Sequence, residues 1–223
     1  LNAAKGNQRA QRMLRDVARE AEAERHSDRL KLFEVAVLYI QQGNQQLDAD
    51  EATGQTILTP EAEESFGKAA DAWASYLKLK PPKPDTGTAI QLAGVHLVLA
   101  QNSNTLTDAI VELENAVDAQ RVAAEADPSV GNLGNLAYYL YLSGQTAEAD
   151  RVAAQAVAKS PKDEQAQARK EFEALKKQGE AIQKQVAQEK KQGAATGGEN
   201  PIEGAGGALG GGSGLGGGSL GTP

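Results

Sequence analysis

The chain has 223 residues, of which 40% are hydrophobic, 24% are charged and only 4% are aromatic. Its formal charge of −7 argues against nucleic acid or an anionic membrane surface as the main partner. It has no cysteine, which excludes disulfides, thiolate metal sites and a cysteine nucleophile. Few aromatic residues together with much Ala, Leu and Val favour packed helices over a β-sandwich.

Residues 1–27 are predicted to form an N-terminal helix with a periodic apolar set and a basic start. The apolar set is Ala10, Met13, Leu14, Val17 and Ala21, and the first charges are Lys5, Arg9, Arg12 and Arg15. The longest apolar stretches, 35–40 and 92–100, fall short of the ~20 residues that cross a bilayer. Because the chain begins with Leu1 and not methionine, the sequence leaves an upstream targeting or anchoring segment open.

Residues 28–81 are predicted to form a helix pair interrupted by a loop insertion at 44–59. The insertion is polar and contains glycine, as loops do. A helix restarts where Thr59 stands as N-cap and Pro60 as first helical residue, followed by acids in the first turn. A second pair follows at 84–128, and its second helix is expected to run about two turns longer than usual.

Residues 129–161 form the third and most regular predicted pair, with a turn at Gly144. Two stretches share one spacing: Ala69, Trp73, Tyr76, Leu77 and Pro81 match Ala149, Ala153, Ala156, Val157 and Pro161. Helices approach closely only where side chains are small. The alanine-rich helix is therefore expected to lie close to the helix before it, whose bulky residues fill the space beside it.

Residues 162–191 are predicted to form a C-terminal helix. Its apolar stripe consists of Ala168, Phe172, Leu175, Ile182 and Val186, with Gly179 filling the gap. The stripe is too short to establish a coiled coil, so a capping helix on the last pair is favoured over a dimer seam. The remainder, 192–223, is rich in glycine and is predicted to be disordered.

The shared spacing resembles the tetratricopeptide repeat, a helix-turn-helix unit of about 34 residues. The resemblance covers residues 28–161, although Ala137, Leu140 and Ala153 depart from the usual residues. It implies an all-α fold, a right-handed α-α superhelix of about three repeats with flanking helices. The insertion, the irregular middle repeat and the Gly-rich end look like a group of uncharacterised bacterial members, which commonly carry an N-terminal membrane anchor.

In that family the first helices of successive repeats line a concave groove that receives peptides. By position, the groove residues here are Phe33, Val37, Ile40, Ile90, Gly94, Leu97, Gly134, Tyr138 and Tyr141. At least Tyr138 or Tyr141 is expected to be exposed in the groove; the alternative is that the tyrosines pack between repeats or under the C-terminal helix. An apolar groove suits a hydrophobic helix or extended segment. These positions lack the Lys, Arg and Asn with which some members clamp a carboxylate.

Other motifs favour no catalytic, metal or cofactor site. The loop with Asp48, Asp50 and Glu51 resembles a calcium loop, but Gly54 comes one place late and the twelfth position has no glutamate, so a solvated loop is preferred. Of the two histidines, His96 is expected to be packed or hydrogen-bonded within a helix.

The resemblance implies a non-catalytic scaffold or adaptor that binds a protein or peptide partner. The alternative is a structural cell-envelope component held by an upstream anchor, and an enzyme ranks third. The sequence leaves the localisation open between the cytoplasm and, if an N-terminal anchor has been removed, the envelope, with membrane contact only through that anchor. It is expected to be a monomer or a weak dimer through the C-terminal helix.

Overall fold

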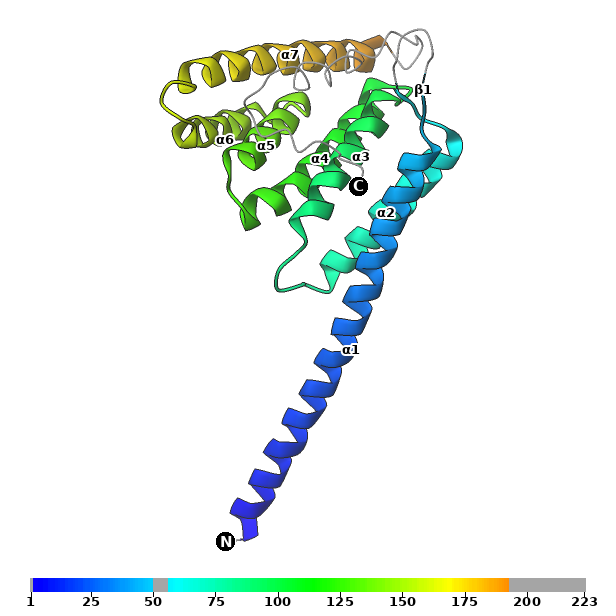
Figure 1. Ribbon diagram of the computed structural model, residues 1–223, viewed down its shortest axis with the longest axis vertical. Helices are drawn as coiled ribbons and strands as arrows, with labels where there is room; N and C mark the ends of the chain where they lie inside the picture. Colours follow the sequence, from blue (N-terminus) through cyan, green and yellow to red (C-terminus); the bar gives the residue numbers. More distant parts are fainter. Residues whose placement is uncertain (1, 50–55, 193–223) are drawn as a thin grey trace.

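A computed structural model describes residues 2–49 and 56–192, with side chains from 24 to 49 and from 56 to 188. The predicted all-α class is confirmed, because helices hold nearly all of the described residues (Figure 1). In chain order they are α1 Asn2–Gln46, α2 Pro60–Lys78, α3 Thr86–Gln101, α4 Leu106–Ala126, α5 Val130–Leu142, α6 Thr146–Lys159 and α7 Gln165–Gln192. Two short strands, β1 Asp48–Ala49 and β2 Thr56–Ile57, pair antiparallel between α1 and α2.

Helix α1 is one continuous helix, although two separate segments, divided between residues 27 and 28, are predicted from the sequence. The predicted division is wrong because no proline or glycine occurs between Gly6 and Gly43, so nothing interrupts the helix. Its C-terminal part packs along α2, and its N-terminal part extends beyond α2 (Figure 1). The Arg29 guanidinium donates a hydrogen bond to the Leu79 carbonyl, 3.4 Å away, near the point where the two helices separate.

Helix α2 begins as the sequence predicts. The Thr59 hydroxyl accepts a hydrogen bond from the Ala62 amide at 3.1 Å, Pro60 is the first helical residue, and Glu61 lies in the first turn. The same hydroxyl donates to the carbonyl of Gln46 at 2.8 Å and so joins the start of α2 to the end of α1. The predicted loop is shorter than 44–59, because α1 continues to Gln46, and residues 50–55 lie outside the described residues.

Helices α3 to α6 form the second and third pairs. The starts of α3, α4 and α5 are capped by Asp85, Thr105 and Ser129, whose side chains accept from backbone amides three residues on. Helix α4 has the predicted extra length and ends just before Asp127. Gly144 makes the predicted turn between α5 and α6, with a φ of +84° that only glycine adopts without strain.

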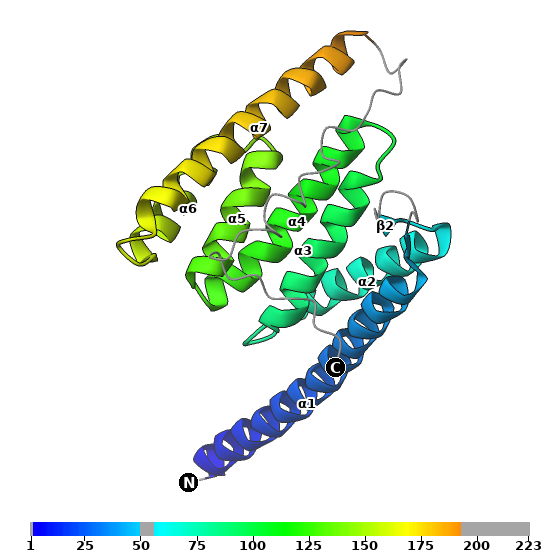
Figure 2. The same cartoon turned by 45° about the horizontal axis from the view of Figure 1, so that its top comes forward.

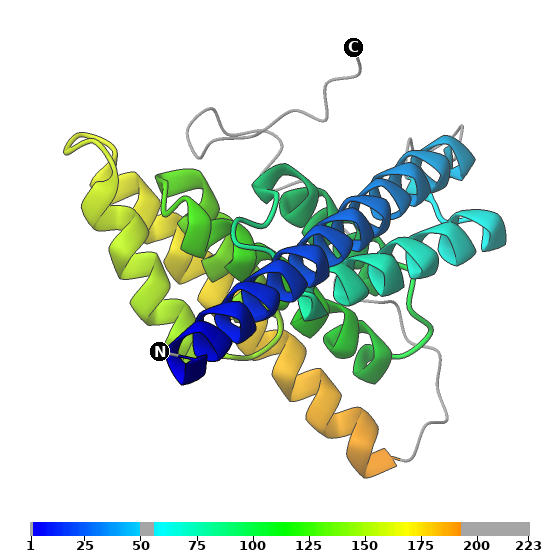
Figure 3. The same ribbon diagram turned by 90° about the horizontal axis from the view of Figure 1, so that it is seen from below.

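The pairs stack in chain order, and the turned view shows α3, α4, α5 and α6 side by side with α7 along them (Figure 2). Within the described ranges, the α1–α2 pair meets the remaining helices only at α3, and α5 packs on α4 without approaching α3. Seen from below, α1 lies in front of the other helices, because its N-terminal part extends away from them (Figure 1 and Figure 3). A right-handed superhelix therefore stays a prediction.

Helix α7 lies on α5 and α6, where the capping interpretation puts it. Its predicted apolar stripe is buried in full: Ala168, Phe172, Leu175, Ile182 and Val186. The predicted disordered tail falls on residues 193–223, outside the described residues. None of the described helices has an apolar stretch that is long enough to span a membrane.

Candidate functional site

The expected groove residues on α1 divide between core and surface. Ile40 is buried and cannot line a groove, so its assignment is wrong; Phe33 and Val37 are half-buried. The Phe33 ring lies 6.0 Å from the Tyr76 ring, centroid to centroid, which turns it towards α2. The reason is helical spacing, because residues 33, 36, 40 and 43 share the face of α1 that packs on α2.

The expected groove residues on α3 are accessible. Ile90 is 38% exposed, and Gly94 and Leu97 are half-exposed on the same face. A Cβ added to Gly94 would meet no heavy atom within 4 Å among the described residues, so the surface there is open. We call these three residues the α3 face. That it binds a partner stays a prediction.

Helix α3 contains no charged residue, and seven of its 16 residues are buried. Among the described helices only α3 and α5 have this composition. His96 is buried on α3, and its Nδ1 lies 2.8 Å from Glu112 Oε2 on α4. The prediction of a hydrogen-bonded helix histidine is confirmed. The α3 face therefore presents apolar atoms without any charged group of its own helix.

The expected groove residues on α5 are covered by α7, so the expected exposure is wrong. Gly134, Tyr138 and Tyr141 are all buried, with both tyrosines only 3% exposed. The Phe172 ring reaches to 4.0 Å from the position of a Cβ on Gly134, and Gly179 of α7 lies against the carbonyl of Tyr141. The alternative from the sequence, packing under the C-terminal helix, is the correct one.

The three tyrosines of α5 are buried in different ways. The ring of Tyr138 packs edge-on against that of Tyr139, 5.2 Å between centroids, and its hydroxyl has no hydrogen-bond partner among the described residues. Burial raises the pKa of Tyr138 well above its ordinary value and raises that of Tyr139 to about 12. Sequence periodicity could not find this, because it shows the faces of a helix but not how many of them its neighbours cover.

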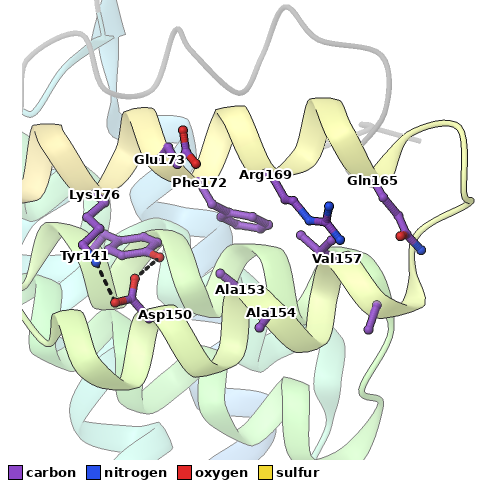
Figure 4. A pocket seen from close by; sticks show the side chains of 11 residues that line it. Tyr141, Asp150, Ala153, Ala154, Val157, Gln165, Arg169, Phe172, Glu173 and Lys176 are labelled. Carbon is purple, nitrogen blue, oxygen red and sulfur yellow. Dashed lines mark hydrogen bonds and ion pairs between the residues drawn. The ribbon is translucent and has the colours of Figure 1, made fainter.

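Tyr141 instead joins a polar link between three helices (Figure 4). Its hydroxyl donates to Asp150 Oδ1 on α6 at 2.8 Å, and Lys176 Nζ on α7 donates to Asp150 Oδ2 at 2.7 Å. The hydrogen bond from Lys176 and, to a smaller extent, that from Tyr141 lower the pKa of Asp150. Burial and, to a smaller extent, the hydrogen bond to Asp150 raise the pKa of Tyr141. This link fastens α7 to the third pair and holds no free acid or base for catalysis.

Acidification is expected to weaken the Tyr141–Asp150–Lys176 link. Because the folded-state pKa of Asp150 lies below its ordinary 3.8, its contribution to stability is complete above that value and is lost as the pH falls through the lowered pKa. Asp150→Asn should remove this part of the acid dependence of the unfolding free energy. Asp163→Asn, an exposed control in the turn before α7, should retain it. Identical acid profiles for the two variants would contradict the role of the link.

No group of three metal-ligating side chains comes together within the described ranges. Of the calcium-like loop, Asp48 is described, and its carboxylate accepts from the Ala49 amide at 2.8 Å. Asp50, Glu51 and Gly54 lie outside the described residues.

No family model, curated protein or solved structure matches the chain. The resemblance to tetratricopeptide repeats therefore rests on the residue spacings alone and stays a prediction.

Proposed function

We propose that the protein is a non-catalytic scaffold of the tetratricopeptide type that binds a protein segment on the α3 face. One observation carries the proposal: α3 has the composition of an enclosed helix but lacks a cover on one side. At 24% charged residues, 16 positions of this chain would hold about four charges, and Thr86–Gln101 holds none. A helix that is apolar on all sides is normally buried.

The comparison with α5 supports this interpretation. Helix α5 also has no charge, and α4, α6 and α7 enclose it so that every residue from Leu136 to Leu142 is buried. Helix α3 packs on α4 and meets α1 and α2, but no described helix covers the α3 face. A partner segment would occupy on α3 the place that α7 takes on α5.

The chemistry of the α3 face favours an apolar helix or extended segment as partner. Cores of protein interfaces are depleted of charged residues, as this face is. Gly94 lets a partner backbone approach between Ile90 and Leu97. Because these side chains carry no acid, base or nucleophile, they favour binding over catalysis.

Substitution of Ile90 tests the proposal. A lysate of the source cell is passed over immobilised full-length chain, Ile90→Asp, or Val111→Asp. Val111 is the matched control, since it is an apolar residue of another helix, α4, and is 50% exposed. A protein that binds directly should be retained by the wild type and by Val111→Asp, and its Kd for Ile90→Asp should rise at least about tenfold, as for a central interface residue.

Equal binding of that protein to Ile90→Asp and Val111→Asp would overturn the proposed site. Circular dichroism of both variants shows whether they remain folded. Because Ile90 is already partly exposed, an aspartate there can be solvated without unfolding α3.

A further inference from the structure

A cleft of about 560 Å³ lies between α6 and α7 (Figure 4). We call it the α6–α7 cleft. Its floor is apolar, formed by Ala153 and Val157 of α6 and by Phe172 of α7, all of them nearly buried. The Tyr141–Asp150–Lys176 link closes one end. The volume lies in the range of small-molecule sites in proteins.

The cleft is lined by alanine at a position of α6 where the matching helix has an aromatic. By the shared spacing, Ala153 corresponds to Trp73 of α2, and Trp73 is packed into the core with its ring 5.0 Å from that of Tyr76. An indole at position 153 would occupy the space between α6 and Phe172.

One positive charge in the cleft has no counter-ion. Arg169 lines it and reaches from α7 towards Val157 (Figure 4), and no acidic group within the described ranges pairs with it. Glu173, one turn further on α7, also lines the cleft, but its carboxylate points away from Arg169 in the same view. Lys176, by contrast, is already neutralised by Asp150 at 2.7 Å.

We propose that the α6–α7 cleft binds a small monocarboxylate with an apolar body. The body lies on Phe172, Val157 and Ala153, and the carboxylate accepts two hydrogen bonds from the planar guanidinium of Arg169. About 10 Å of helix separates Arg169 from Lys176, which sets the length of the body at that of a phenyl ring with a short alkyl chain. Asp150 at the closed end disfavours a second carboxylate there.

Titration of the full-length chain with 4-phenylbutyrate tests the proposal, with the neutral 4-phenylbutyramide as matched ligand and calorimetry or NMR as readout. The carboxylate should bind at least about tenfold more tightly than the amide, the usual gain from a charge-assisted hydrogen bond. Arg169→Gln should remove that preference. Lys170→Gln, which takes away an exposed charge from the neighbouring position outside the cleft, should preserve it.

A second test of the proposal fills the cleft with a bulky side chain. Ala153→Trp restores the aromatic of the matching helix and should abolish binding of both ligands while the helical content is retained. The proposal is overturned if neither ligand binds at millimolar concentration, if the amide binds as tightly as the carboxylate, or if Arg169→Gln keeps the preference. Arg169 is exposed on α7, so its substitution leaves the fold intact and the test valid even if Ala153→Trp fails to fold.

Discussion

The Gly179→Val variant is expected to lose roughly 3 kcal/mol of unfolding free energy and to melt on the order of 10 °C lower than the wild type. A Cβ at Gly179 would overlap the carbonyl oxygen of Tyr141 and come within 2.8 Å of its carbonyl carbon. These are backbone atoms of α5, which cannot rotate away as the end of a side chain can. Helix α7 must therefore move off α5 or the two backbones must be strained.

Gly67→Val is the matched control for this prediction. Gly67 also lies inside a helix, but a Cβ there would meet nothing within 4 Å among the described residues. Its effect should stay within about 0.5 kcal/mol, as at ordinary surface positions. Denaturant unfolding of both variants gives the comparison. Similar stabilities for Gly179→Val and Gly67→Val would show that α7 does not lie on α5 in the described way.

Tyrosine ionisation reports separately on the position of α7. In the wild type, burial raises the pKa of Tyr139 to about 12, and the pKa of Tyr138 also lies well above its ordinary value. If Gly179→Val detaches α7 while α5 stays folded, Tyr138 gains access to water and should ionise at a lower pH. An ultraviolet pH titration distinguishes this local detachment from loss of the whole fold.

Helix ends and turns could be predicted because their causes are local. Thr59 with Pro60 starts α2, and Gly144 makes the turn before α6, as expected. Each depends on one or two residues and on backbone groups within four positions, which a single sequence contains. The apolar stripe of α7 was equally readable, since helical spacing alone places Ala168 and Phe172 on one face.

The state of α5 could not be predicted from periodicity. Tyr138, Tyr139 and Tyr141 point in different directions around the helix, and the spacing alone suggests that one of them faces solvent. All are buried because α4, α6 and α7 meet around α5. The available signal was the absence of charge over Val130–Leu142, which is typical of an enclosed helix.

That signal has a different meaning at α3, where the same composition leaves the α3 face open. The lack of charged residues indicates that a helix is suited to burial on all sides, and the structure shows which sides are buried. The candidate site is the side of α3 that is apolar but exposed, so both the sequence and the structure are needed to find it. The break expected near residue 27 does not occur, because no proline or glycine interrupts the helix between Gly6 and Gly43.

The contact between Gly43 and Phe66 is expected to behave as a coupled pair. Phe66 is fully buried, and a Cβ on Gly43 of α1 would overlap two carbons of its ring and lie 3.1 Å from a third. Gly43→Ala should therefore destabilise by about 1 kcal/mol, with the overlap exceeding the gain in helix propensity. Phe66→Leu should cost about 2 kcal/mol, less than the ~3–5 for complete removal of a buried ring.

The double variant Gly43→Ala/Phe66→Leu tests whether Gly43 and Phe66 are in contact. With leucine at position 66, no ring meets the new methyl group that Gly43→Ala introduces. The stability losses of the two single variants should therefore add up to at least about 1 kcal/mol more than the loss measured for the double variant. Gly94→Ala is the control: its Cβ meets nothing within 4 Å, and its effect should add to that of Phe66→Leu. Strict additivity for Gly43→Ala as well would contradict the packing of α1 on α2.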